Sequence, residues 1–290
     1  DRMTDGGEVV LDDAGLPIVQ RMEELRVSFT VPMGTRPDGG WPIVIYAHGT
    51  GGSVHSFEND HTAERMAAQG LAAISIDQVL HPPRVPDGTS PELAFFNFQN
   101  PLAARYNALQ GGIDDFQLVR LVREMQVDEL APGEPVFDPS RIYFFGHSQG
   151  GLTGPPFLAH EPLVSGAVLS GAGGLLYLSL LHKTEPVDIA GLVATLIRDY
   201  PLDEFNPVLA LLQGWIDVSD ATVYAPLLVR RPLDGIGGKA IYQSEGFTDR
   251  YTPTVSIEAL ATAIGGAQVD PVILEIPGLA LRGSEVLTAP

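Results

Sequence analysis

The sequence predicts an α/β protein with a mostly parallel, twisted sheet, helices on both faces and an inserted helical cap. Two observations predict this fold class. Short apolar runs such as 43–47 and 142–145 alternate with helix-like segments, and fully apolar strands are typical of sheets covered on both faces. The second run also leads directly into Gly146-His147-Ser148-Gln149-Gly150, a tight turn from strand to helix.

The first half of the chain supplies three predicted strands and two predicted helices. The strands are expected over 26–31, where polar and apolar residues alternate, and over the apolar runs 43–47 and 71–76. Asp60 is expected to cap a helix that ends at Gly70. Seven Pro or Gly residues predict an irregular excursion over 78–111, and an apolar stripe predicts a helix over about 113–128.

The second half continues the alternation around one interruption. After the turn at Ser148, short strands are expected at 167–169, 240–243 and 272–276, with a helix between Thr252 and Gly265. The apolar segment 174–235 breaks the rhythm and is interpreted as a mostly helical cap. The prediction is one domain over 1–290, and 44% apolar residues supply enough material for its core.

Ser148 is the candidate nucleophile. A sharp strand-to-helix turn lifts a serine hydroxyl clear of the sheet, and the glycines at 146 and 150 let neighbouring backbone pass close to it. A reacting serine also needs hydrogen-bond donors for the oxyanion. The glycine-rich run His48-Gly49-Thr50-Gly51-Gly52 follows the buried strand 43–47, so the N–H groups of Thr50 and Gln149 are the expected oxyanion hole.

The candidate acid is Asp249. It follows the strand 240–243 and precedes the helix that begins near Pro253, so it is expected at the same sheet edge as Ser148. Asp217 is the second candidate, although its surroundings are more typical of a solvated turn.

Three motifs, in their order along the chain, resemble those of the α/β-hydrolase family: His48-Gly49-Thr50-Gly51-Gly52, Gly146-His147-Ser148-Gln149-Gly150, and Gly246-x-x-Asp249 before Pro253. The resemblance covers about residues 40–277. It implies a sheet of about eight strands, a Ser–His–Asp triad and hydrolysis of an ester or similar acyl bond through an acyl-enzyme. Within the family the chain looks similar to secreted bacterial esterases and lipases.

The histidine that the family places after the acid is missing. All seven histidines precede Asp249, and the helix expected after the last strand is absent too. One explanation is that a C-terminal segment beyond Pro290 carries both; Asp1 in place of an initiator Met agrees with a processed chain or one prepared for expression. The alternatives are that His182 or His81 serves as the base, or that this protein keeps the fold but has lost catalytic activity.

Composition excludes several other classes of function. A net charge of −19 argues against nucleic acid as a partner, and the absence of cysteine excludes disulfides and thiolate metal sites. No cofactor or metal is expected: no phosphate-binding motif is present, and Asp60, near His55 and His61, is better used as a helix cap. Residues 162–181 carry no charge, but their glycines and serines favour a strand over an integral membrane segment.

Two functions follow as hypotheses. The first is a serine hydrolase that cleaves small-molecule or lipid-like esters with hydrophobic acyl groups. The second is an inactive scaffold that binds an apolar ligand or a partner. The expected location is secreted or in the cell envelope, with the cytoplasm as the alternative.

Overall fold

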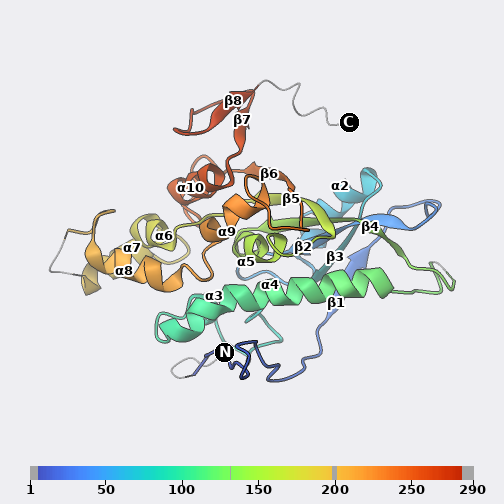
Figure 1. The fold of residues 1–290 in the computed structure, drawn as a ribbon, viewed down its shortest axis with the longest axis horizontal. Helices are drawn as coiled ribbons and strands as arrows, with labels where there is room; N and C mark the ends of the chain where they lie inside the picture. Colours follow the sequence, from blue (N-terminus) through green and yellow to red (C-terminus); the bar gives the residue numbers. More distant parts are fainter. Residues whose placement is uncertain (1–5, 131, 198–200, 283–290) are drawn as a thin grey trace.

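The computed structural model describes residues 6–130, 132–197 and 201–282. Its centre is a sheet in which a single antiparallel edge strand, β1, joins five parallel strands (Figure 1). The spatial order is β1 (Val27–Thr30), β3 (Ala72–Ile76), β2 (Trp41–Ala47), β4 (Phe137–His147), β5 (Val164–Ser170) and β6 (Ala240–Ser244). The predicted parallel sheet is therefore confirmed, with six strands in the described part of the chain instead of about eight.

Alternating side chains of the buried strands fill two cores. Ile43 and Ile45 of β2 belong to the larger core, whereas Tyr46 belongs to a smaller core on the opposite face. β2 is apolar throughout because both of its faces are covered.

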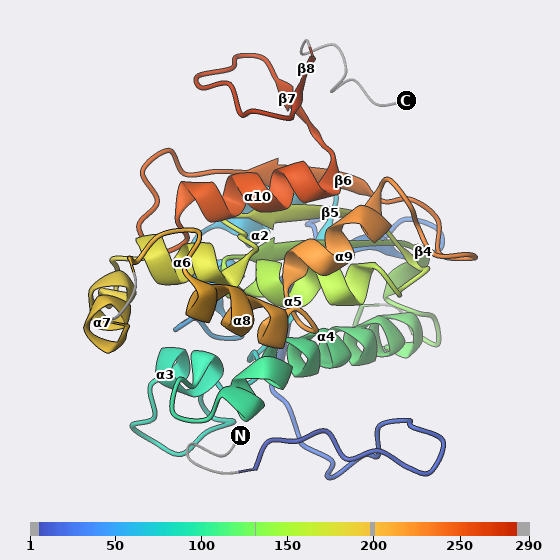
Figure 2. The ribbon, with the colours of Figure 1, turned by 60° about the vertical axis from the view of Figure 1, so that its left-hand side comes forward.

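Helices cover both faces of the sheet, as predicted. Figure 2 shows four helices side by side over one face: α4 (Pro101–Glu124), α5 (Gln149–Leu158), α9 (Ala221–Leu228) and α10 (Thr254–Ile264). The smaller core, on the other face, includes residues of α1 (Ser56–Asn59) and α2 (Thr62–Ala68).

The segment between β5 and β6 is largely helical. α6 (Leu176–His182), α7 (Ile189–Leu196) and α8 (Pro207–Ile216) share a small core of their own, whereas α9 packs against α5 and α10. The interpretation of 174–235 as an inserted cap stays a prediction. No helix in the described ranges is both long and apolar enough to cross a membrane.

Two predictions were wrong: the start of the helix predicted over about 113–128, and the strand predicted over 272–276. α4 begins at Pro101 rather than near residue 113, because Asn100 caps it by accepting a hydrogen bond from the Ala103 N–H at 3.2 Å. Its interior Gly111 does not break it. A Cβ there would lie 2.5 Å from Cγ2 of Thr153, so the glycine lets α4 and α5 pack closely.

Residues 272–276 are not a strand. Ile273 is 85% exposed, and the nearby strands β7 (Ala267–Val269) and β8 (Ala280–Arg282) pair only with each other, away from the main sheet (Figure 1). A short apolar run does not distinguish a core strand from an exposed loop, and this run pairs with no strand in the described part of the chain.

Candidate active site

Ser148 occupies a strained turn between β4 and α5. Its φ of 50° and ψ of −110° lie outside the conformations that most side chains adopt. The turn is possible because its flanking glycines lack side chains. A Cβ on Gly150 would lie 2.1 Å from the carbonyl oxygen of Ala47, and one on Gly146 would lie 2.6 Å from that of Gly150. The Ser148 N–H donates to the carbonyl of Ser170 at 2.8 Å, which fixes the turn to β5.

The loop after β2 (residues 48–54) lies against this turn. The Thr50 hydroxyl donates to Oε1 of Gln149 at 2.8 Å, so the two residues expected to hold the oxyanion are in contact. Gln149 is the first residue of α5, where a backbone N–H has no partner within the helix. The Thr50 N–H also makes no hydrogen bond within the described residues. Two backbone N–H groups that make no hydrogen bond within the described residues therefore lie next to Ser148.

Hydrogen bonds of two buried histidine rings fix the 48–54 loop in place. Nε2 of His81 accepts a hydrogen bond from the Gly51 N–H, and Nε2 of His48 accepts one from the Gln78 N–H, each at 2.9 Å. Burial lowers the pKa of His48 to about 4 and also lowers the pKa of His81. Both rings are therefore neutral near pH 7, as acceptors of N–H bonds must be.

Asp249 lies in the loop after β6. Its Oδ1 accepts hydrogen bonds from the N–H groups of Tyr251 at 2.8 Å and Thr252 at 2.9 Å. Its Oδ2 faces the backbone of Gly171, where an added Cβ would lie 3.5 Å away. Gly171 directly follows the residue that receives the Ser148 N–H, so Ser148 and Asp249 flank the carboxyl end of β5.

The other candidate acid lies elsewhere. Asp217 caps the end of α8, and its Oδ1 accepts from Nε2 of Gln213 at 2.8 Å. Asp249 instead faces Gly171, next to the residue of β5 that accepts the Ser148 N–H, so Asp249 is the better placed of the two candidate acids.

Ser148 lines two adjoining cavities. The apolar chamber, of about 160 Å³, is lined mainly by hydrophobic side chains, among them Phe95, Phe96, Leu152, Leu180, Ile189 and Leu192. The vestibule, of about 210 Å³, has a more polar lining that includes Ser90 and Gly51. Five residues line both cavities and so mark their junction: Thr50, Glu92, Ser148, Lys183 and Tyr251.

Comparison with solved structures identifies the fold. No family model and no curated protein sequence matches the chain. Among solved structures, the acetyl xylan esterase from Paenibacillus sp. R4 aligns over 77% of this chain and 73% of its own, with a TM-score of 0.50 and 17% identity. The chain has the α/β-hydrolase fold. Acetyl xylan esterase 1 from Thermoanaerobacterium sp. JW/SL YS485 aligns over 82% of this chain and 79% of its own, with a TM-score of 0.47 and 14% identity.

No histidine of this α/β-hydrolase fold is hydrogen-bonded to Ser148 or Asp249 in the described part of the chain. His81 has both ring nitrogens engaged, since Nδ1 lies 3.1 Å from the Val79 carbonyl, so it is not free to act on Ser148. His147 is exposed, with Nδ1 3.4 Å from the Ser170 hydroxyl. His182 is exposed at the end of α6.

Sequence reasoning missed three charged residues at the pocket. Asp220 is buried and caps α9 while accepting the N–H groups of Leu175 and Leu176, which fixes the start of α6. Its position before a helix is a capping signal that the sequence does contain. Glu92 and Lys183 form an ion pair at the cavity junction, and no sequence pattern links two residues so far apart in the chain.

Proposed function

We propose that this protein hydrolyses carboxylic esters, with Ser148 as the nucleophile and Asp249 as the acid that orients the base. The observation that carries the proposal is the strained Ser148, which lines an apolar chamber beside two backbone N–H groups that have no hydrogen-bond partner among the described residues. The acetyl xylan esterase named above shares the fold at 17% identity and, as its name states, cleaves an ester. The proposal itself rests on the geometry at Ser148.

In this mechanism the Ser148 hydroxyl attacks the ester carbonyl and passes its proton to an imidazole. The negative charge that develops on the carbonyl oxygen is held by the N–H groups of Thr50 and Gln149, and one such donor is worth about 2.7–4 kcal/mol of barrier. The alcohol leaves with the proton, and water then releases the acid from Ser148. The lining of the apolar chamber favours hydrophobic acyl groups.

The base in this proposal is a histidine other than the seven in this sequence, supplied by a C-terminal segment beyond Pro290. Two observations support it. No described histidine is bonded to Ser148 or Asp249, and Oδ2 of Asp249 accepts no hydrogen bond within the described residues. An imidazole placed beside that oxygen would be held by it, as a catalytic carboxylate holds its histidine.

Added imidazole tests this arrangement in the chain as it stands. We expect p-nitrophenyl butyrate hydrolysis to rise with imidazole and to saturate, above the background that imidazole produces alone. Ser148→Ala should lower the enzymatic rate by about 10³-fold or more, because the nucleophile is removed. Ser179→Ala, which deletes another hydroxyl lining the apolar chamber, is the matched control and should retain the rate. Equal rates for Ser148→Ala and the unaltered protein would refute the assignment.

A second function is favoured by the same lack of a bonded histidine: a scaffold that binds an apolar ligand without turnover. It predicts saturable binding of a p-nitrophenyl ester and no product, even with imidazole present. Release of p-nitrophenol that depends on Ser148 excludes it.

A further inference from the structure

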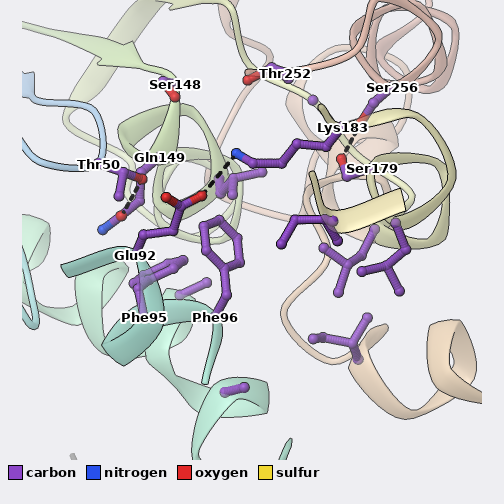
Figure 3. A pocket seen from close by; sticks show the side chains of 18 of the residues that line it. Thr50, Glu92, Phe95, Phe96, Ser148, Gln149, Ser179, Lys183, Thr252 and Ser256 are labelled. Atoms are coloured by element: carbon purple, nitrogen blue, oxygen red, sulfur yellow. Dashed lines mark hydrogen bonds and ion pairs between the residues drawn. The ribbon is translucent and has the colours of Figure 1, made fainter. Parts of the chain in front are cut away.

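An ion pair crosses the pocket beside Ser148. Nζ of Lys183, at the end of α6, lies 3.3 Å from Oε1 of Glu92, in the first turn of α3 (Pro91–Phe96). Each side chain is only 15% exposed. Figure 3 shows Lys183 extending toward Glu92, with Ser148 on one side of the pair and Phe95 and Phe96 on the other.

Further contacts fix the lysine in this position. Its Nζ also donates to the carbonyl of Tyr251 at 3.1 Å and lies 5.7 Å from the centre of the Phe96 ring. Tyr251 in turn donates its N–H to Asp249. Lys183 therefore joins three segments that are distant in sequence: α3, α6 and the loop that carries Asp249.

The pair lies where the two cavities meet. Glu92 and Lys183 line both the apolar chamber and the vestibule, as does Ser148. Because the pair lies between Ser148 and the side chains of Phe95 and Phe96, an acyl chain that extends from Ser148 toward that part of the apolar chamber must pass it (Figure 3). Charged groups at the passage resist displacement, because separating two poorly exposed charges leaves each of them without its partner.

We propose that the Glu92–Lys183 pair determines acyl specificity by limiting how far an alkyl chain reaches from Ser148 into the apolar chamber. This inference rests on the proposed function, since it assigns the preferred substrates of the same site. Those are esters of short, uncharged acyl groups, and longer chains enter only when the pair opens. The apolar side chains on the far side of the pair from Ser148, among them Phe95 and Phe96, supply surface that long chains would contact if the pair were absent.

Binding of non-hydrolysable ethers tests the inference without turnover. The dissociation constants of p-nitrophenyl butyl ether and p-nitrophenyl decyl ether are measured by calorimetry for the unaltered protein and for the double variant Glu92→Leu/Lys183→Met. Replacing both partners avoids a buried unpaired charge. We expect the preference for the decyl ether over the butyl ether to rise at least about tenfold, the equivalent of about two more buried methylene groups.

A second ion pair supplies the matched control. Glu185, just after α6, and Arg250, in the loop that carries Asp249, form an ion pair at 3.1 Å, but they are exposed and line neither cavity, so Glu185→Gln should leave the preference unchanged. If circular dichroism shows the double variant unfolded, Glu92→Gln/Lys183→Gln replaces it, with an expected rise of at least about threefold. A preference unchanged in a folded variant overturns the inference. An inactive Ser148 would overturn only the proposed function, because the ether measurement needs no reaction.

Discussion

The missing side chain of Gly150 decides whether the Ser148 turn can form. The backbone of β2 passes so close that an added Cβ would lie 2.1 Å from the Ala47 carbonyl oxygen, a contact that only movement of β2 or α5 can relieve. This requirement was predicted from the sequence, because glycines on either side of a nucleophilic serine serve that purpose.

Gly150→Ala should therefore destabilise the fold. We expect the free energy of unfolding to fall by about 1–3 kcal/mol or more, the usual cost of forcing atoms into a packed site. Urea denaturation measures it. Gly214→Ala, in the exposed part of α8 with no atom near the added Cβ, is the control and should stabilise the protein by up to about 1 kcal/mol. Equal effects of the two changes would contradict the steric explanation.

Residues that approach each other only through the fold could not be predicted in the same way. The sequence places Thr50, Ser148 and Asp249 after strands, and parallel strands bring such residues to one edge. Glu92 and Lys183 follow no comparable rule. Their contact depends on how α3 and α6 face each other across the pocket, which neither segment's composition specifies.

At the scale of the elements, the 48–54 loop depends on the protonation state of two histidines. His48 and His81 accept its hydrogen bonds and those of the adjoining Gln78 only as neutral rings. Burial lowers the pKa of His48 from 6.5 to about 4. Between these pH values the unfolded chain binds a proton that the folded chain does not, so the stability from this group is complete above pH 6.5 and is lost toward pH 4.

His48→Gln should remove part of this pH dependence. Between pH 7.5 and 5.5 the unaltered protein should lose about 1 kcal/mol of unfolding free energy through His48 alone, and the variant should lose that much less. Urea denaturation at the two pH values measures the difference. His182→Gln replaces an exposed histidine outside the loop and should leave the pH dependence unchanged. The same loss in His48→Gln as in the unaltered protein would show that His48 does not titrate as its burial implies.

Helix and strand boundaries were predicted less well than the elements themselves. Gly111 was taken as a breaker because glycine disfavours helices in isolation, but here it allows the close contact of α4 with α5. The run 272–276 has a strand's composition but pairs with no strand of the described residues, although β6 is an edge strand. In both cases tertiary packing decided the outcome, and a local pattern contains no information about the neighbouring element.

For the molecule as a whole, the parallel sheet accounts for how the site is assembled. The loops after β2, β4 and β6 all leave the same edge, and β5 separates the Ser148 turn from the Asp249 loop. The helices α6, α7 and α8, with α3 opposite, then enclose the apolar chamber above that edge. The core of the fold thus fixes Ser148 and Asp249, while the segments outside it line the apolar chamber and, in the proposed function, determine which acyl groups fit.

The net charge of −19 has a consequence at the same scale. The chain has 36 acidic and 17 basic residues, so repulsion among carboxylates should outweigh the attractive pairs at neutral pH. Raising NaCl from 10 mM to 150 mM shortens the screening length from about 30 Å to about 8 Å. We therefore expect the unfolding temperature at pH 7.5 to rise by about 2–4 °C, the equivalent of about 1 kcal/mol.

The control is the same salt step near the sequence isoelectric point of about 4.5, where the net charge is close to zero. There the unfolding temperature should change little or should fall. A lower unfolding temperature in salt at pH 7.5 would show instead that local ion pairs, such as those of Arg84 with Glu23 and Asp114, outweigh the overall repulsion.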